Sequence, residues 1–477
     1  MEKNKEKNNN ENKPKKKYKN KIFSPQNIFF FFIPIIIFFN IYLFNTNPEI
    51  LELKKRVKEL ESKIGEMETK AIKKKIKIGF YSDNMAGNRI GRFETVLSEL
   101  LVKTGKYDVY LINKIETEFD YKYNKKIHRN IIVKDKESLK NFDEENDIQV
   151  YIISNDVSEI IDYFQSFGKK VIGVFHGIYF LCAFQDETLL YKSWKDFIKF
   201  DSFVISIPDD YWIYKKLGFN NTIYFPYIKT FDYKNTPSSP LTSKNILMVG
   251  RTDETIKGAK YGILAMSEIL KKIPDARLTI IGLNYSEDIE ELINNLNIKD
   301  RVNYPGYSLN ITEFYLNASV LLAPYITESG GLVINEAKAH GIPIVAFNID
   351  YCPTYNSGVI TVEMLNYKKM AKEVIKLLDN FEYRKKKGEE AKLSLKDFES
   401  NDEIVELWDK LIHSVLSGGE DYTQLQRKIE KKYYNSTVAE EHLKKHYKYV
   451  QKVNNNFRCH SLNDLTNLEY IKSIESC

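Results

Sequence analysis

Residues 327–337 read TESGGLVINEA, and residues 341–345 read GIPIV. The run before them, VLLAPY at 320–325, is short, apolar and typical of a buried strand. The loop after this strand carries Glu328 and two glycines into a helix, where glycines let a ligand approach the backbone and unpaired N–H groups attract phosphate. The stretch therefore predicts a strand–loop–helix unit with an anion-binding site where the helix begins.

The same alternation of short apolar runs and helical patterns continues on both sides of this unit. In the same half of the chain, residues 245–251 (NILMVGR) and 276–282 (ARLTIIG) predict further strands. An earlier series starts at 75–83 (KIKIGFYSD) and includes 171–177 (VIGVFHG), and residues 231–244 predict the linker between the two series. The sequence therefore predicts an α/β protein with two Rossmann-like domains and a ligand cleft at the carboxyl ends of the strands.

Charge and cysteine content restrict the class of partner. Residues 1–22 hold nine lysines and three glutamates, a net charge of +6 that equals the formal charge of the whole chain. The remainder is near neutral, so a nucleic-acid partner is not indicated. The four cysteines are far apart in the sequence and indicate neither a metal site nor a disulfide-held scaffold: Cys182, Cys352, Cys459 and Cys477.

The N-terminus predicts a membrane anchor. Residues 1–22 are polar and low in complexity, which is typical of a disordered basic tail. Residues 23–45 contain no charged side chain and are long enough to cross a hydrocarbon core of ~30 Å as a helix. A cleaved signal peptide would have a shorter apolar region and a small-residue cleavage site, so we predict a permanent transmembrane anchor.

The flanks of the anchor predict its orientation. Lysines are more frequent on its N-terminal side, which favours a cytosolic N-terminus and places the rest of the chain across the membrane. Residues 46–75 have apolar side chains at three- and four-residue steps and predict a helical stalk. The stalk is too short to separate a coiled coil, which would give a homo-oligomer, from a simple spacer.

Residues suited to phosphate and sugar chemistry stand where predicted strands end. Arg251 closes one strand and Lys257 precedes the next helix, and cations there can hold the charge of a departing diphosphate. Glu336 lies one to two turns into the helix that follows Gly330-Gly331, where a carboxylate can accept hydrogen bonds from sugar hydroxyls. Taken alone, Glu328 and Glu336 would equally fit an exposed loop charge and a solvated helix face.

Taken together and in this order, residues 245–350 resemble the donor domain of the retaining family-4 glycosyltransferases, which have the GT-B fold. The resemblance implies that Arg251 and Lys257 bind the donor diphosphate. It also implies that Glu328 binds the donor sugar, that Glu336 binds the ribose and that the glycine turn faces the phosphates. The predicted site comprises, for catalysis, His176 and Glu328 and, for donor binding, Gly91, Arg251, Lys257, Ser329, Gly330, Gly331, Leu332 and Glu336.

The N-terminal half is similar to the same family at fewer positions. Residues 89–94 (RIGRFE) are similar to the glycine loop that opens the first helix, which gives Gly91 its predicted role. His176, at the end of a strand, matches a histidine that faces the donor sugar, although a lone histidine there would more often be structural. Residues 226–228 are Pro-Tyr-Ile where the family usually has Pro-Asn-Gly. The resemblance covers about residues 76–415.

Absent motifs also bear on the chemistry. The chain has no G-x-G-x-x-G and no Walker A motif, so an NAD-dependent enzyme or a P-loop ATPase is not indicated. It also has no Asp-x-Asp, the pair that single-domain metal-dependent glycosyltransferases use to hold Mn²⁺ or Mg²⁺. We therefore expect no metal, with cationic side chains in its place.

The resemblance implies a glycosyltransferase that moves a sugar from a UDP- or GDP-type donor to a glycan, lipid or protein acceptor with retention of anomeric configuration. Two alternatives stay open, another GT-B enzyme such as a nucleotide-sugar epimerase and an inactive sugar-nucleotide-binding scaffold. Because a bacterial exterior offers no nucleotide sugar, the lysine bias places the catalytic domains in the ER or Golgi lumen. The predicted organisation is a tail (1–22), an anchor (23–45), a stalk (46–75), an acceptor domain (76–235), a donor domain (244–415) and a helical extension (416–477).

Overall fold

The computed structural model describes residues 52, 55–62, 75–82, 89–115, 125–154, 158–177, 194–231, 233–252, 256–283, 285–308, 310–453 and 462–473. Residues 75–477 form one compact unit, and residues 1–74 form another. The predicted tail and the predicted anchor at 23–45 lie outside the described residues, and only part of the predicted stalk, including 55–62, is described and helical. Within the described ranges, no helix has the length and apolar character needed to cross a bilayer.

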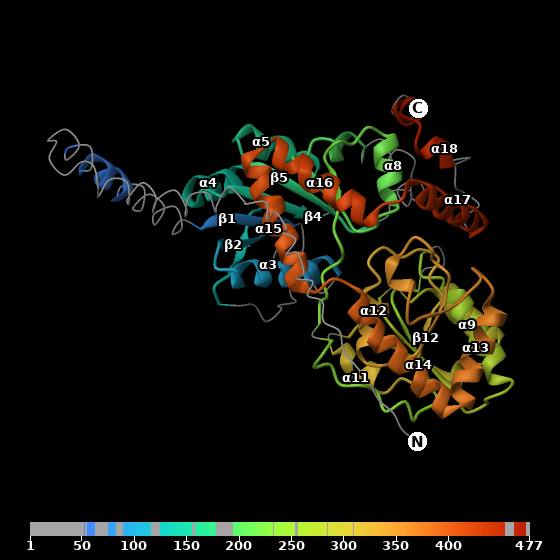
Figure 1. Ribbon diagram of the computed structural model, residues 1–477. Helices are drawn as coiled ribbons and strands as arrows, with labels where there is room; N and C mark the ends of the chain where they lie inside the picture. Colours follow the sequence, from blue (N-terminus) through green and yellow to red (C-terminus); the bar gives the residue numbers. More distant parts are fainter. Residues whose placement is uncertain are drawn as a thin grey trace, which may run out of the picture. The chain divides into compact units, whose positions relative to one another are not determined.

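The first half of the compact unit contains a parallel sheet (Figure 1). Seven described strands form this sheet in the order β3-β2-β1-β4-β5-β6-β7, and their pairings are parallel. The strands are β1 (Ile76–Ser82), β2 (Tyr107–Asn113), β3 (His128–Ile132), β4 (Val150–Ser154), β5 (Lys170–Phe175), β6 (Ser202–Ile205) and β7 (Thr222–Tyr224). The helices between them include α3 (Arg89–Lys103), α4 (Lys136–Asn146), α5 (Ser158–Ser166) and α8 (Asp210–Lys216).

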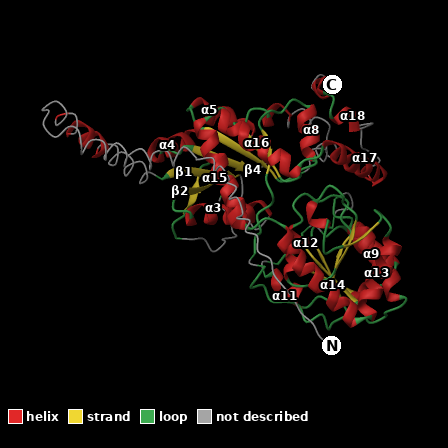
Figure 2. Ribbon diagram, in the orientation of Figure 1, coloured by secondary structure: helices red, strands yellow, loops and turns green. Residues whose placement is uncertain are grey.

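The second half repeats this architecture with a six-stranded sheet among the described residues, in the order β10-β9-β8-β11-β12-β13. Its strands are β8 (Asn245–Val249), β9 (Arg277–Ile281), β10 (Val302–Gly306), β11 (Val320–Ala323), β12 (Ile344–Phe347) and β13 (Ile360–Val362). Its helices are α9 (Ala259–Leu270), α10 (Glu287–Asn295), α11 (Ile311–Leu316), α12 (Leu332–Ala339), α13 (Tyr367–Asp379) and α14 (Phe381–Leu393), with short 3-10 turns between some elements (Figure 2). The prediction of an α/β protein with two Rossmann-like domains is confirmed.

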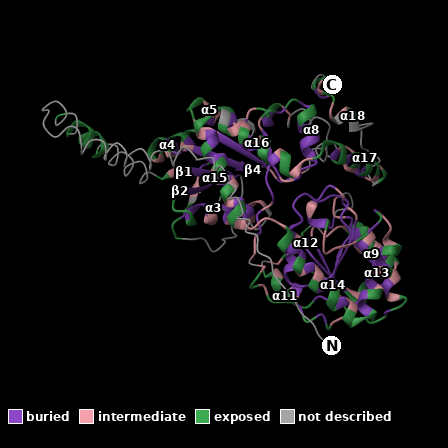
Figure 3. Ribbon diagram, in the orientation of Figure 1, coloured by how far each residue is buried: buried purple, intermediate pink, exposed green. Residues whose placement is uncertain are grey.

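Burial explains why these strands read as continuous apolar runs. Every residue of β4, β6, β11 and β12 is buried, because helices cover both faces of a parallel sheet (Figure 3). In the second sheet the strand order reverses between β8 and β11. Adjacent strand ends at such a reversal leave a crevice for ligands, so the loops after β8 and β11 are the place to search for a site.

The C-terminal helices return to the first half of the unit. They are α15 (Asn401–Ser417), α16 (Glu420–Tyr433), α17 (Ser436–Val453), α18 (Leu462–Leu465) and α19 (Leu468–Ser473). In α15 the Trp408 ring lies 6.2 Å from the Phe93 ring of α3, and Asp409 accepts a 2.6 Å hydrogen bond from Tyr107. The predicted donor domain ran to residue 415, and α15, which begins within that range, packs its apolar face against α3 of the first half.

Candidate active site

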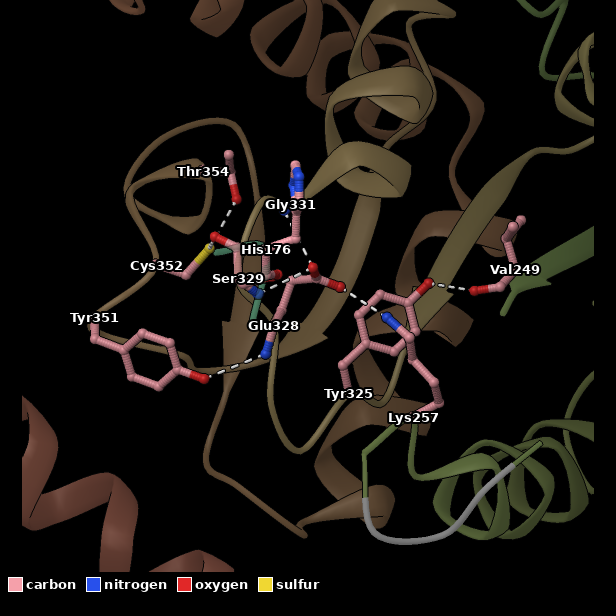
Figure 4. A network of polar contacts seen from close by, with 10 residues as sticks. All are labelled: His176, Val249, Lys257, Tyr325, Glu328, Ser329, Gly331, Tyr351, Cys352 and Thr354. Atoms are coloured by element: carbon pink, nitrogen blue, oxygen red, sulfur yellow. Dashed lines mark hydrogen bonds and ion pairs between the residues drawn. The ribbon is translucent and has the colours of Figure 1, made fainter. Parts of the chain in front are cut away.

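Glu328 lies in the loop between β11 and α12, and its side chain is 3% exposed. Its Oε2 atom is 2.8 Å from Lys257 Nζ (Figure 4). Its Oε1 atom accepts hydrogen bonds from the backbone N–H groups of Ser329 at 3.0 Å and Gly331 at 3.2 Å. A buried carboxylate needs such compensation by a cation and N–H donors. The structure thus brings together two predicted site residues that are far apart in sequence.

Lys257 is positioned by the end of β8 and the beginning of α9. Its ammonium lies 4.2 Å from the centre of the Tyr325 ring, and the Tyr325 hydroxyl donates a 2.6 Å hydrogen bond to the carbonyl of Val249. The next residue, Gly258, has φ +59°, and a Cβ there would lie 2.2 Å from the Pro324 carbonyl oxygen. Only glycine fits at this position, so the backbones after β8 and β11 approach closely beside Lys257.

The glycine turn before α12 is equally constrained. Gly331 has φ +57°, and a Cβ there would lie 2.0 Å from Thr354 Oγ1. Ser329 Oγ donates a 2.6 Å hydrogen bond to the backbone carbonyl of His176, which belongs to the first domain. A Cβ on Gly330 would lie 3.0 Å from the Tyr227 ring. Leu332, the first residue of α12, is buried. The contacts with His176 and Tyr227 place the turn against the first domain.

His176 follows β5 and is 1% exposed. Its Nδ1 atom lies 3.0 Å from the Tyr227 hydroxyl and its Nε2 atom 3.3 Å from Ser154 Oγ. The Phe93 ring meets the imidazole edge-on at 4.8 Å. The side chain is therefore held by groups of its own domain, while its carbonyl receives the hydrogen bond from Ser329.

Glu336 lies in α12 and is also buried. Its Oε1 atom is 2.6 Å from Arg92 Nη2, and its Oε2 atom accepts a 2.8 Å hydrogen bond from the Tyr315 hydroxyl. Burial and the Glu336 charge hold the pKa of Tyr315 well above its usual value, so this hydroxyl remains a donor. Sequence spacing did not indicate Arg92, which comes from α3 of the other domain. In the sequence, only its place beside Gly91 pointed to Arg92 as a site residue.

Two predicted residues lie differently from the others. Gly91 is inside the first turn of α3 and its carbonyl accepts a 2.6 Å hydrogen bond from Thr95 Oγ1, so it belongs to the helix and not to the loop before it. Arg251 follows β8 and is exposed, whereas Lys257 is mostly covered. The prediction of Gly91 as a loop residue is wrong, because α3 begins at Arg89.

Buried ionisable groups surround these residues. Glu94 on α3 is 0% exposed, and burial raises its pKa to about 8 against a smaller opposing contribution from the Ser154 hydroxyl. Lys338 on α12 donates a 2.8 Å hydrogen bond to the Thr354 carbonyl, and burial lowers its pKa to about 8. Burial raises the pKa of the Cys352 thiol to about 12, so this cysteine is not a nucleophile. Among the residues with assigned structure, no three His, Cys, Asp or Glu side chains cluster to hold a metal.

Part of the chain is similar to known glycosyltransferases. Residues 230–394 match the model of the family Glycosyl transferases group 1. An uncharacterized glycosyltransferase of Haemophilus influenzae is 30% identical over 199 residues, which cover 41% of this chain and 56% of the relative. The chain therefore spans about half of that relative's length.

Two solved structures are similar in fold. Sucrose-phosphate synthase from Thermosynechococcus elongatus has a TM-score of 0.61 at 17% identity, covering 72% of this chain and 100% of that chain. Anabaena HepE, solved in complex with UDP-glucose, has a TM-score of 0.57 at 13% identity, covering 71% and 100%. Residues 230–394 therefore match a Glycosyl transferases group 1 domain, within a two-domain architecture that fits the GT-B fold.

Proposed function

We propose that this protein is a glycosyltransferase that moves a sugar from a nucleotide-sugar donor to a glycan, lipid or protein acceptor. The observation that carries the proposal is the mostly buried Lys257–Glu328 pair, 2.8 Å apart, beside Gly331, the positive-φ glycine that precedes α12. This pair stands at the strand-order reversal of a domain that matches a glycosyltransferase family. The structural similarity to HepE, whose structure holds UDP-glucose, supports a nucleotide-sugar ligand.

In this proposal the donor diphosphate lies against Arg251, Lys257 and the N–H groups at the beginning of α12. A diphosphate there competes with Glu328 for Lys257, so donor binding would free the Glu328 carboxylate to accept hydrogen bonds from sugar hydroxyls. Glu336 would bind the ribose, and it would exchange part of its pairing with Arg92 to do so. His176, held by Tyr227 and Ser154, orients the donor sugar.

We further propose that transfer retains the anomeric configuration. In this proposal, none of the described side chains near the donor turn acts as a covalent nucleophile. Attack of the acceptor on the same face, with the leaving phosphate oxygen taking the acceptor proton, then breaks one glycosidic bond and forms another. The cations hold the charge that develops on the diphosphate, so the reaction needs no metal ion.

We also propose that residues 23–45 anchor the protein in a membrane, with a cytosolic N-terminus and the catalytic domains in the ER or Golgi lumen. The support is the uncharged apolar run and the lysine bias on its N-terminal side. The helix at 55–62 would then act as a spacer between the bilayer and the enzyme.

The proposal is tested by ligand screening followed by product analysis. The purified chain is heated with each of a panel of UDP- and GDP-sugars, and the sugar that raises the melting temperature is the candidate donor. NMR of the anomeric proton after incubation with that donor distinguishes transfer or hydrolysis with retention from epimerisation. A protein that binds a nucleotide sugar without consuming it would be a scaffold, and one that binds none would refute the proposal.

A further inference from the structure

Helix α17 (Ser436–Val453) lies beyond the segment that matches the family model. Asn435 caps it, because its side-chain oxygen accepts a 3.2 Å hydrogen bond from the N–H of Val438. The buried side chains of the helix recur at three- and four-residue steps: Ala439, Leu443, His446, Tyr447 and Val450. The helix is therefore docked along one stripe, and two histidines lie on or beside that stripe.

One end of this stripe contacts the first domain. His442 Nδ1 lies 2.7 Å from Asp209 Oδ2, in the segment that begins α8. Burial raises the pKa of Asp209, and the contact with His442 opposes that rise. The helix is thus attached to α8 through a partly buried polar contact.

One turn later the same helix contacts the second domain. Lys445 Nζ lies 2.5 Å from Asp350 Oδ2, in the loop after β12. The His446 ring meets the Tyr351 ring edge-on, with centroids 4.7 Å apart at 84°. A single helix therefore contacts α8 of the first domain and the loop after β12 of the second.

These contacts lead directly to Glu328. Its backbone N–H donates a 3.2 Å hydrogen bond to the Tyr351 hydroxyl (Figure 4). On the other side of the loop, the N–H of Ile326 donates a 2.8 Å hydrogen bond to the carbonyl of Ile256, which precedes Lys257. The loop is thus held between Ile256 and Tyr351, whose ring packs against His446, and these contacts set the position of Glu328 relative to Lys257.

We propose that α17 is a strap that positions the donor loop, with Tyr351 and His446 as positioning residues for Glu328. The inference rests on the proposed function, because it takes Glu328 as a donor-binding residue. His446 is suited to the task, since burial lowers its pKa to about 3 and leaves it a neutral ring that packs against Tyr351.

The test is hydrogen–deuterium exchange of the full chain, measured on peptides that cover residues 324–331. Tyr351→Phe removes only the oxygen that accepts from Glu328, and His446→Ala removes the ring that packs against Tyr351. Each should raise amide exchange in this loop about ten-fold, as expected for loss of one buried contact. Lys444→Ala, on the exposed side of α17, should leave it unchanged.

Kinetics with the donor found for the wild type supply the second readout. Mispositioned Glu328 should raise the KM for the donor in both variants, whereas a merely smaller folded fraction would lower kcat and leave KM unchanged. The exchange measurement needs no donor, so it tests whether α17 positions the Glu328 loop even if the wild type transfers no sugar. If His446→Ala does not fold, Tyr351→Phe decides. Exchange at 324–331 equal to wild type in the folded variants would overturn the proposal.

Discussion

Glu94→Gln should make the protein more stable at neutral pH. The Glu94 carboxyl is fully buried, and burial raises its pKa from 4.5 to about 8, with only a smaller opposing contribution from the Ser154 hydroxyl. The folded protein therefore keeps a proton on this group that the unfolded chain loses above pH 4.5. Between these pKa values, each pH unit lowers the free energy of unfolding by about 1.4 kcal/mol.

Glutamine has the shape of the protonated acid and does not titrate, so the variant escapes this loss. At pH 7, about 2.5 units above the unfolded pKa, the wild type has lost about 3 kcal/mol through Glu94. Other differences between the carboxyl and the amide do not change with pH. The quantity to examine is therefore the slope: the stability gained by Glu94→Gln should grow by about 2.7 kcal/mol between pH 5.5 and 7.5.

The assay is urea unfolding followed by tryptophan fluorescence, at pH 5.5, 6.5 and 7.5, for the full chain. Glu99→Gln removes a carboxylate from a less buried position on the same helix and controls for the change in net charge. A stability difference between wild type and Glu94→Gln that stays constant over this range would show that Glu94 is not held protonated by the fold.

Three further predictions follow from the same structure. Gly331→Ala should lower the free energy of unfolding by about 1–3 kcal/mol and therefore the melting temperature, because φ is +57° and the new Cβ would meet Thr354 Oγ1. An unchanged melting temperature would contradict the described turn. Activity should survive EDTA, and complete loss restored by Mn²⁺ would count against the metal-independent chemistry. When the protein is expressed in a eukaryotic host, endoglycosidase treatment should increase its gel mobility. Asn435→Gln should remove part of that shift, since residues 435–437 form an exposed Asn-Ser-Thr sequon. An unglycosylated protein whose C-terminus is digested by protease added to intact microsomes would place the domains in the cytosol.

The sequence predicted the fold because buried parallel strands have a distinctive composition. Runs such as 246–249 and 320–323 are apolar throughout. The placement of α15 could not be predicted in the same way. Its apolar spacing shows that one face is buried but not which domain buries it, and the structure packs Trp408 against Phe93 of the first domain.

The predicted site was incomplete for a related reason. Lys257 and Glu328 could be paired because both stand at strand ends of one sheet, where parallel topology brings loops together. The Arg92–Glu336 contact joins two domains, and no spacing in the sequence encodes it. Tyr227 stood out only as a departure from the family's usual Pro-Asn-Gly, and the structure places its hydroxyl 3.0 Å from His176.

In the proposed function, the Lys257–Glu328 centre binds and activates a nucleotide sugar. The most direct test is the rate of nucleotide release from the donor identified by screening, compared between wild type, Lys257→Ala and the control Lys272→Ala on the exposed end after α9. Loss of a contact to the departing diphosphate should lower the rate in Lys257→Ala by about 10²–10³, or ~3–4 kcal/mol, while Lys272→Ala stays at the wild-type rate. A folded Lys257→Ala that releases nucleotide as fast as wild type would show that Lys257 does not hold the departing diphosphate.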